Sequence, residues 1–581
     1  MKGIASTLAT IWRLAVPYFH SEDRRAGRIL LIAVIATELS LVAINVLLNQ
    51  WNNRFYNALQ DRNWDAFVSE LMFFCLLAAA YILLAVYQVY LNQWLQIRWR
   101  QWMTRAYLGN WLGAANHYRM QLLGDAADNP DQRIAEDIQL FVERTLTIGI
   151  GLLSALVTLG SFVVILWTLS VAAPLHIFGT EWNIPGYLVW AALIYALVGT
   201  YFTHLIGWPL ITLNFNQQRY EADFRFNLVR VRENSEQIAL LKGEPAETER
   251  LVDRFGRVVA NWLLIMKRTK LLTFFTASYS QVSIVFPYVV VSPAYFAGKM
   301  QLGGLMQTAS AFNSVQTSLS FFINVYRSLA EWRAVIQRLD GFDLAVVAAR
   351  AAAHTPPVIE VEAGGDGLAV ELNDVAVNLP SGVPLVSSDN VKLPRGEPVL
   401  FNGPSGSGKS TLFRAIAGIW PFGSGRVVVP KDARLMMLPQ RPYFPVGSLA
   451  AAVTYPAEAG SYDRQHIGEA INAVGLPALA QRLDEEAHWN RMLSLGEQQR
   501  LGIARALLQK PDFLFLDEAT ASLDEPSEAA LYRLIQERLP NAAVISIGHR
   551  STLAAFHRRR LALQRETGGY RLHEAALKPA E

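Results

Sequence analysis

The sequence predicts two joined domains: an α-helical membrane domain with six spans, and after it an α/β domain of the P-loop type. Three observations predict this fold class. The first part of the chain holds long, nearly charge-free apolar runs, GPSGSGKST (403–411) follows a strand-like stretch, and FLFLDE (513–518) is a buried-strand pattern that ends in two carboxylates. We expect domains at 1–340 and 367–575, joined by a linker rich in Ala, Gly and Pro at 341–366.

The membrane spans come first in the chain. A bilayer is crossed by about 20 apolar residues, and six runs meet this length, at 29–49, 67–91, 146–170, 187–210, 271–296 and 303–326. Lys and Arg gather in segments 92–145 and 212–270 and are absent from 171–186. The positive-inside rule therefore places both termini and both long segments in the cytoplasm. Buried helices of a large soluble protein would not show this asymmetry.

The two cytoplasmic segments have helical periodicity, so we expect them to extend the membrane helices and to couple them to the second domain, around 112–135 and 216–240. Solvated helix faces without a role would show the same pattern. Residues 4–19 are expected to form an amphipathic helix on the membrane surface or a loosely ordered terminus.

Several polar residues lie at membrane depth, where they are costly unless they face water or one another. We expect a polar translocation cavity for the transported solute, and hydrogen bonding between helices is the alternative for each residue. The cavity candidates are Glu38, His204, Gln281, Asn313 and Gln316.

Composition excludes other classes. The net charge of +3 on 581 residues does not favour nucleic-acid binding, and HRRR (557–560) is expected to be a solvated basic patch. The single cysteine, Cys75, excludes a disulfide framework within the chain.

The segment GPSGSGKST matches the G-x-x-x-x-G-K-[ST] pattern. Its glycines let backbone N–H groups converge on phosphate oxygens, its lysine adds charge, and its serine hydroxyl suits Mg²⁺. The predicted nucleotide-binding residues are Gly403, Pro404, Ser405, Gly406, Ser407, Gly408, Lys409, Ser410 and Thr411.

Four residues after apolar strands complete the predicted catalytic site. Asp517 is expected to hold Mg²⁺, and Glu518 to orient or deprotonate the attacking water. His549 is expected to contact the terminal phosphate, and Gln440 to sense metal and water. In isolation, Gln440 and His549 would be weak candidates, since each also fits an ordinary strand end.

These motifs occur together with LSLGEQQR (493–500) and FLFLDEATASLD. In their order and rough spacing, they resemble the motifs of ABC-transporter ATPase domains. Six spans before one such domain is the half-transporter layout of the exporter type. NRFYNALQDRNWDAF (53–67) and DNPDQRIAEDI (128–138) resemble the bacterial SbmA/BacA-related transporters with fused ATPase and the ABCD transporters of peroxisomes and lysosomes. The usual signature motif of the family is LSGGQ. Here Leu495 and Glu497 replace its first glycine and its glutamine, as in that subgroup's variant.

The resemblance implies ATP and Mg²⁺ as cofactors and a second identical chain as partner. Ser494, Leu495, Gly496 and Glu497 would contact the ATP held by the partner, and Asp524 would lie at the dimer interface. From the residues alone, LSLGEQQR is a capped helix start, with Ser494 and Glu497 as a capping box. The family's adenine-stacking aromatic is missing, because no aromatic occurs between Gly367 and Leu400 and Leu379 stands in its place.

The expected function is a homodimeric, ATP-driven transporter in a bacterial inner membrane, with its ATPase domain in the cytoplasm and no nucleic-acid partner. The subgroup implies import of large hydrophilic solutes such as peptides or cobalamin. Export of a lipid, fatty acyl compound or amphiphile is the alternative. An ATP-gated channel is a third hypothesis, against which the complete catalytic set of Glu518 and His549 argues.

Overall fold

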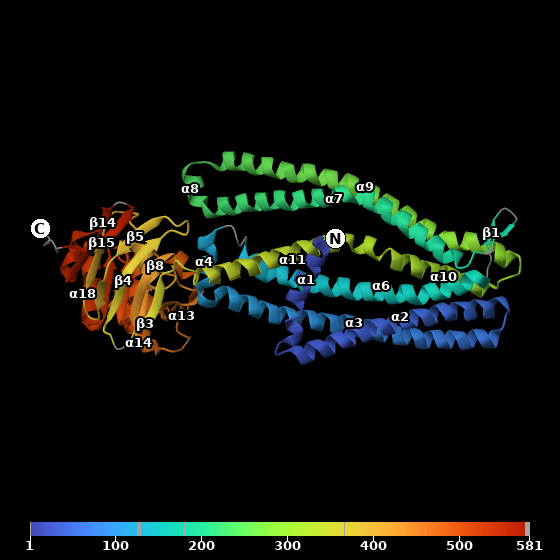
Figure 1. Ribbon diagram of the computed structural model, residues 1–581, viewed down its shortest axis with the longest axis horizontal. Coiled ribbons are helices and arrows are strands. Elements are labelled where there is room, and N and C mark those ends of the chain that lie inside the picture. The colour runs from blue at the N-terminus through green and yellow to red at the C-terminus, as the bar shows by residue number, and fades with distance from the viewer. Residues whose placement is uncertain are drawn as a thin grey trace. The chain divides into compact units, whose positions relative to one another are not determined.

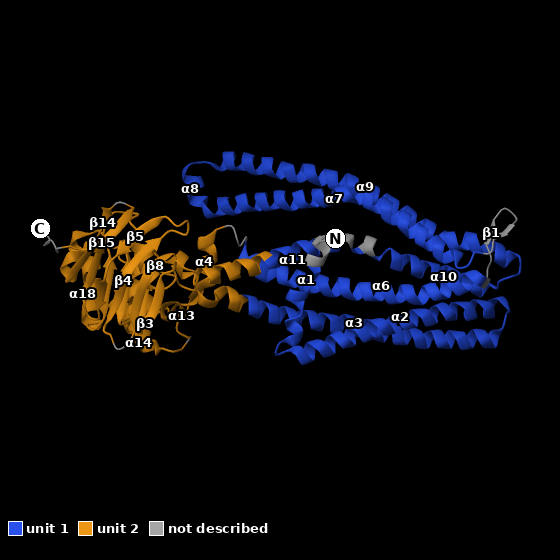
Figure 2. Ribbon diagram, viewed as in Figure 1, with its two compact units in different colours: residues 1–107, 129–340 blue, residues 108–128, 341–581 orange. Residues whose placement is uncertain are grey.

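The computed structural model describes residues 2–124, 129–172, 175–177, 180–182, 184–364, 367–458, 460–566 and 568–575. The chain divides into two compact units (Figure 2). The first consists of residues 1–107 and 129–340, and the second of residues 108–128 and 341–581. The second unit therefore contains the predicted ATPase domain together with a short segment that the sequence places between two membrane helices.

The first unit is built from long helices. Its helices, with those that lead into the second unit, are α1 (Lys2–Ala15), α2 (Arg24–Gln60), α3 (Trp64–Leu112), α4 (Asn116–Leu123), α5 (Pro130–Gln132), α6 (Ile138–Ala172), α7 (Tyr187–Glu233), α8 (Ser235–Leu240), α9 (Glu244–Phe296), α10 (Leu302–Leu319) and α11 (Phe321–Ala352). Two short strands, β1 (Leu175–Ile177) and β2 (Thr180–Trp182), form a hairpin between α6 and α7.

Among the described residues, five helices are long and apolar enough to cross a membrane: α2, α3, α6, α7 and α9. On α3, Leu76, Ile82 and Val86 are more than half exposed, as side chains that face lipid would be. The sixth predicted span, 303–326, differs from its prediction. It consists of α10 and the start of α11, which meet at Ser320, and the polar residues of α10 lower its hydropathy.

The cytoplasmic segments expected to be helical are helical in the structure. Helix α3 continues without a break to Leu112, and α7 continues to Glu233. Helices α7 and α9 run side by side, and the short helix α8 closes the turn between them (Figure 1). Of the predicted coupling segment 112–135, residues 125–128 lie outside the described residues.

Helices α2 and α10 are joined by a row of amide side chains that we call the amide ladder, formed by Asn49, Asn53, Asn57, Gln60 and Gln307. Its α2 members are spaced so that they share one helix face. Gln307 donates to Asn49 Oδ1 at 3.2 Å and accepts from Asn53 Nδ2 at 2.7 Å. Asn57 Oδ1 and Gln60 Oε1 accept the backbone N–H groups of residues 303 and 302, at 2.8 and 2.6 Å.

The amide ladder requires a close approach of the two helices at Gly303. A Cβ atom built there would lie 1.9 Å from the Asn53 carbonyl oxygen, far inside van der Waals contact. The glycine therefore lets the first turn of α10 dock directly on α2, and the first N–H groups of α10 find acceptors on the facing helix.

The predicted linker, 341–366, is largely regular structure. Helix α11 runs past position 340 to Ala352, and strand β3 begins at Glu360. The alanines of AARAAA explain the difference, because alanine has the highest helix propensity of all residues. Residues 365 and 366 lie outside the described residues.

The second unit contains one large sheet. Its strands are β3 (Glu360–Gly364), β4 (Ala369–Asn378), β5 (Pro384–Ser388), β6 (Val391–Pro394), β7 (Val399–Asn402), β8 (Gly423–Pro430), β9 (Leu435–Leu438), β12 (Phe513–Asp517), β13 (Ala543–Ile547), β14 (Arg559–Glu566) and β15 (Gly569–Ala575). Their order is β3-β8-β4-β5-β15-β14-β7-β13-β12-β9, with β6 paired to β4. Strands β7, β13, β12 and β9 are parallel neighbours.

The helices of this unit are α12 (Lys409–Ile416), α13 (Leu449–Thr454), α14 (Arg464–Ala473), α15 (Pro477–Ala480), α16 (Trp489–Met492), α17 (Leu495–Gln509) and α18 (Glu525–Arg538). Strands β10 (Gly447–Ser448) and β11 (Glu486–Ala487) form a small separate pair. Strand β12 is buried on both faces: Phe513 and Phe515 join one hydrophobic cluster, and Leu514 and Leu516 join the other. Such a strand is typical of a parallel sheet covered on both sides.

The basic patch expected at HRRR is not fully solvated, because His557 is buried. Its Nε2 lies 2.9 Å from the Ser546 hydroxyl oxygen, and its Nδ1 lies 2.7 Å from the Leu553 carbonyl oxygen. Burial lowers the pKa of His557, because the charged imidazolium is disfavoured away from water.

This burial predicts a pH dependence of stability. The folded chain protonates His557 at a lower pH than the unfolded chain does, so the stabilisation is fully present above the unfolded pKa of about 6.5 and is lost as the pH falls toward the lowered value, by at most about 1.4 kcal/mol per pH unit. Thermal unfolding of the purified protein between about pH 7.5 and about pH 5.5 would show it. His557→Gln should flatten this dependence. Equal curves for the wild type and the His557→Gln variant would contradict the prediction.

Candidate functional site

The predicted catalytic residues meet at one edge of the parallel sheet. The phosphate loop follows β7, Gln440 follows β9, Asp517 ends β12 with Glu518 next, and His549 follows β13. Because β7, β13, β12 and β9 are parallel neighbours, their carboxyl ends lie at the same edge, which is where ligands bind in open α/β sheets. The sheet topology therefore brings together four motifs that are far apart in the sequence.

The phosphate loop turns directly into helix α12. Gly408 caps the helix with φ of 89°, and a Cβ atom there would lie 2.5 Å from Val386 Cγ2, so both conformation and space require glycine. Lys409 is buried, and its Nζ donates to the carbonyl oxygens of Gly403 and Pro404, each at 2.8 Å. Burial lowers the pKa of Lys409, and the nearby Glu518 and Asp517 carboxylates oppose this shift.

Ser410 and Asp517 form a site suited to a cation. The Ser410 hydroxyl donates to Asp517 Oδ1 at 2.8 Å. Burial raises the pKa of Asp517, and the hydrogen bond from Ser410 acts against this shift. Within the described parts of the chain, no group of three or more His, Cys, Asp or Glu could hold a metal ion. The oxygen pair nevertheless fits Mg²⁺, which takes one or two protein oxygens and completes its shell with phosphate oxygens and water.

Glu518 lies between the other two catalytic candidates. Gln440 Nε2 donates to its Oε2 at 3.4 Å, and His549 Nε2 lies 3.3 Å from its Oε1. The Glu518 backbone has φ of 52°, a left-handed conformation that costs a non-glycine residue about 1–3 kcal/mol and is found mainly at functional sites. The carboxylate is about one-third exposed, so water can reach it. This geometry suits a general base with one partner on each side.

The loop that carries His549 is held in place by the buried carboxylate of Glu528. Glu528 accepts from the Thr520 hydroxyl at 2.6 Å and from Arg550 Nη1 at 3.3 Å. Arg550 Nη2 also donates to the Ala521 carbonyl oxygen at 3.2 Å. Glu528 therefore ties the segment after Glu518 to the residue that follows His549. Sequence reasoning missed it, because a Glu in the first turn of a helix looks like an ordinary solvated side chain.

The signature segment opens helix α17, hereafter the signature helix, with a capping box. The Glu497 backbone N–H donates to Ser494 Oγ at 3.3 Å, and the Ser494 backbone N–H donates to Glu497 Oε2 at 2.8 Å. The Ser494 hydroxyl also donates to Glu497 Oε2, at 2.8 Å. The capped helix start expected from the residues alone is therefore present. Leu495 and Gly496 form its first turn, and contact with the ATP of a partner stays a prediction.

Asp524 precedes helix α18 and is exposed. A hydrogen bond with Ser527 lowers the pKa of Asp524, so the side chain carries its charge at neutral pH. An exposed carboxylate at the start of a helix suits an interface position, and the predicted role at the dimer interface stays a prediction.

The polar candidates of the membrane helices are spread over several environments. Gln88 donates a hydrogen bond to Glu38, and Gln316 is buried and donates to the Ser320 hydroxyl at 3.1 Å. His204 stacks edge-on against Trp208, and Gln281 and Asn313 are exposed. The hydrogen bond of Glu38 joins α2 to α3 and agrees with the alternative of bonding between helices, whereas that of Gln316 stays at the end of its own helix. The shared cavity stays a prediction.

Helix α4, from the first predicted coupling segment, packs on the ATPase sheet within the second unit. Tyr118 and Leu122 lie against a hydrophobic cluster of the sheet. Arg119 is buried and its Nη2 donates to the Gly418 carbonyl oxygen at 3.5 Å. In contrast, Leu240 and Leu241 at the end of the second coupling segment are more than three-quarters exposed. The first segment thus contacts the ATPase sheet, and its role in coupling stays a prediction.

The region expected to hold the adenine ring is aliphatic. Leu379 and Val383 lie at the turn between β4 and β5, where the Leu379 backbone N–H donates to the Val383 carbonyl oxygen at 2.8 Å. Both side chains are exposed. A base bound here would find apolar contact without the aromatic face that stacking requires.

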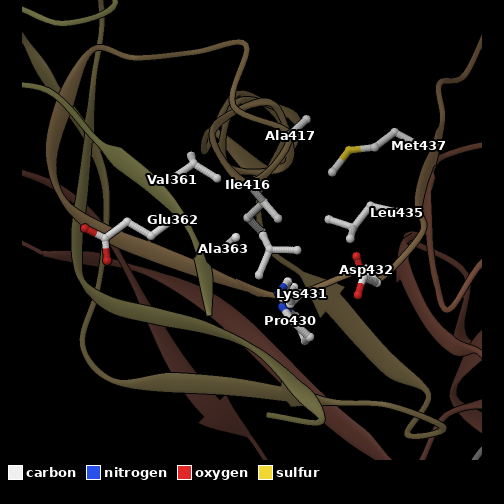
Figure 3. A pocket seen from close by; sticks show the side chains of 11 residues that line it. Val361, Glu362, Ala363, Ile416, Ala417, Pro430, Lys431, Asp432, Leu435 and Met437 are labelled. Carbon is white, nitrogen blue, oxygen red and sulfur yellow. The ribbon is translucent and has the colours of Figure 1, made fainter. Parts of the chain in front are cut away.

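A separate cavity of about 370 Å³ lies beside the far end of α12 (Figure 3). Ile416 and Ala417 line it together with residues of β3, β8 and β9. None of the residues that line it belongs to the predicted site. The cavity is therefore distinct from the phosphate-loop end of the same helix.

A membrane domain of long apolar helices joined to a P-loop ATPase site defines a transporter driven by ATP. A family model described as ABC transporter transmembrane region 2 matches residues 14–296, and one described as ABC transporter matches residues 386–521. The chain belongs to the ABC transporter family and is an ATP-hydrolysing transporter.

Relatives and a solved structure cover nearly the whole chain. The inner membrane ABC transporter ATP-binding protein YddA of Escherichia coli is 35% identical over 92% of this chain and 94% of its own length. The lysosomal cobalamin transporter ABCD4 of Mus musculus is 26% identical over 94% of this chain and 92% of its own. The structure of a bacterial Atm1-family ABC exporter with ATP bound has a TM-score of 0.73 at 18% identity and covers 94% of both chains. This last likeness confirms the predicted exporter-type fold.

Proposed function

We propose that the protein is a homodimer that uses ATP hydrolysis to import large hydrophilic solutes, such as peptides or cobalamin, across a bacterial inner membrane. The observation that carries this proposal is that one chain holds all of the predicted ATP-site residues. Lys409, Gln440, Glu518 and His549 lie at one sheet edge, and Ser494 caps a separate helix. Two identical chains would form two complete sites if each signature faced the other chain's phosphate loop.

In each site, different residues of the chain would bind the nucleotide, hold the metal ion and activate the attacking water. Lys409 and the loop N–H groups would bind the phosphates, and Ser410 and Asp517 would hold Mg²⁺, which supplies charge neutralisation when bound. Glu518 would take a proton from the attacking water, and His549 would contact the terminal phosphate. Ser494 of the opposite chain would close the site. ATP binding would join the two ATPase domains, and hydrolysis would release them.

The cargo is inferred from the relatives and from the polar membrane residues. ABCD4 is named a cobalamin transporter, and the exposed Gln281 and Asn313 on the membrane helices favour a hydrophilic cargo over a lipid. The alternative is export of a lipid, fatty acyl compound or amphiphile, which the exporter-type fold would equally allow. The name of the Escherichia coli relative supports the inner-membrane location.

Uptake by cells tests the proposal. Cells that express the wild-type chain should accumulate labelled cobalamin or a labelled cationic peptide, and cells that express the Glu518→Gln variant at the same level should not. Uptake in the wild type alone would establish ATP-driven import of hydrophilic cargo.

Equal uptake by the two strains would reject both cargoes, and labelled lipids in inside-out vesicles would then test export. The channel hypothesis makes a different prediction. It requires bilayer conductance that depends on ATP and persists in the Glu518→Gln variant, since binding alone would open a gate.

A further inference from the structure

A buried amide on the signature helix contacts three backbone groups in two segments of the predicted ATP site. Gln499 is 1% exposed. Its Nε2 donates to the Gln440 carbonyl oxygen at 3.0 Å and to the Glu518 carbonyl oxygen at 3.5 Å. Its Oε1 accepts from the Ser522 backbone N–H at 3.0 Å. Both N–H donors and the carbonyl acceptor of this one side chain are thus used on backbone groups outside its own helix.

Both segments carry predicted catalytic or interface residues, with Gln440 in one and Glu518 and Asp524 in the other. The Gln440 side chain donates to the Glu518 carboxylate, and Ser522 lies two residues before Asp524. Glu518 has a left-handed backbone, and its conformation is fixed from two directions. Its N–H donates to the Ile547 carbonyl oxygen at 3.2 Å, and its own carbonyl oxygen accepts from Gln499. The strained conformation therefore depends on bonds of this kind.

We propose that Gln499 is a positioning residue that fixes Gln440, Glu518 and the loop before Asp524 to the signature helix of the same chain. The inference rests on the proposed homodimer, in which that helix reaches the partner's ATP. Engagement of the signature at one ATP site would then set the geometry of the base at the other. The two sites would be linked through a single buried amide.

The physical reason lies in the amide itself. A planar group with two donors and one acceptor, all buried and all paired, has one orientation. If α17 tilts or shifts, the Gln440 and Glu518 backbones must follow or their bonds must break, which leaves buried polar groups without partners. The link therefore transmits displacement in both directions.

The neighbouring residue, Gln498, is a matched control. It is also buried, and it also donates to two carbonyl oxygens, those of Asn490 and Leu493. Its partners lie in α16 and at the first residue of the signature segment, and not in the segments that hold Gln440 and Glu518. Gln498→Met and Gln499→Met thus remove the same number of donors, from the same helix, with the same change of side chain.

The first measurement is ATP hydrolysis by the purified, reconstituted protein as a function of ATP concentration. Gln499→Met should lower kcat by about 10- to 100-fold, since small misplacement of a catalytic group can cost about 10²-fold. Binding of a fluorescent ATP analogue should stay within about threefold, because the phosphate loop is untouched. Gln498→Met should keep kcat within about threefold of the wild type, although it should lose about as much thermal stability as Gln499→Met does. Equal loss of kcat in both variants would overturn the proposal.

Mixed dimers of differently tagged chains show whether Gln499 acts on the base of its own chain or on that of the partner chain. The reference pairs a Glu518→Gln chain with a wild-type chain. If Gln499→Met is added to the Glu518→Gln chain, the rate of ATP hydrolysis should stay within about twofold of the reference. If it is added to the other chain, the rate should fall as far as it does in the Gln499→Met homodimer. An equal decrease in both arrangements would show that Gln499 does not act on its own chain's base. If no mixed dimers form between tagged chains, the proposed homodimer fails, and the two failures are therefore distinguishable.

Discussion

Replacing Glu518 with glutamine will stop steady-state ATP hydrolysis while leaving ATP bound. Glutamine keeps the size of the side chain and can still contact Gln440 and His549, but it cannot accept a proton from water. Loss of a general base lowers the rate by about 10²- to 10⁴-fold. The purified variant should therefore retain labelled ATP after gel filtration and release almost no phosphate.

The control for this prediction is a carboxylate that takes no part in the site. Glu537 is exposed near the end of α18, and Glu537→Gln should hydrolyse ATP at the wild-type rate. A Glu518→Gln variant that hydrolyses ATP near the wild-type rate would show that the catalytic base lies elsewhere.

Replacing Gly303 with alanine will destabilise the membrane unit. The new methyl group would fall 1.9 Å from the Asn53 carbonyl oxygen and 2.5 Å from Asn57 Oδ1, so α10 must move away from α2. Overpacking of a close contact costs about 1–3 kcal/mol, and here the displaced helix also loses hydrogen bonds of the amide ladder. The midpoint of thermal unfolding in detergent, measured at one scan rate, should fall by several degrees.

Gly160 offers the matched substitution. It lies within α6, and a Cβ atom there would have no neighbour within 4 Å. Gly160→Ala should therefore unfold at or slightly above the wild-type midpoint, because alanine is the better helix former by about 1 kcal/mol. Indistinguishable midpoints for the two variants would mean that α2 and α10 are not packed as closely as described.

The sequence alone predicts the features of this protein that are formed by contiguous residues. The phosphate loop, the carboxylates after β12 and the long apolar helices are each defined by one short stretch. Their convergence at one sheet edge follows from the strand order, and the resemblance to ABC ATPases anticipated it. The role of Glu518 in turnover is a prediction that the Glu518→Gln variant addresses, and the roles of Asp517 and His549 stay predictions.

The features that the sequence did not reveal depend on contacts between distant segments. Asn49 and Gln307 are 258 residues apart, and nothing in either segment identifies the other. Gln499 looks like one polar residue among several in EQQR, until the fold places three backbone groups around its amide. The first part of the predicted linker is helical for a local reason, since AARAAA suits a helix at least as well as a flexible segment.

The amide ladder has a consequence for the energy source of transport. Its side chains and their backbone partners are neutral at every physiological pH, so breaking the hydrogen bonds of the ladder would not itself displace an ionised group of the ladder. A transmembrane potential acts on charge, at about 2.3 kcal/mol per elementary charge per 100 mV. A transmembrane potential therefore does not act on these hydrogen bonds directly, and in the proposed ATP-driven cycle the free energy needed to break them would come from ATP.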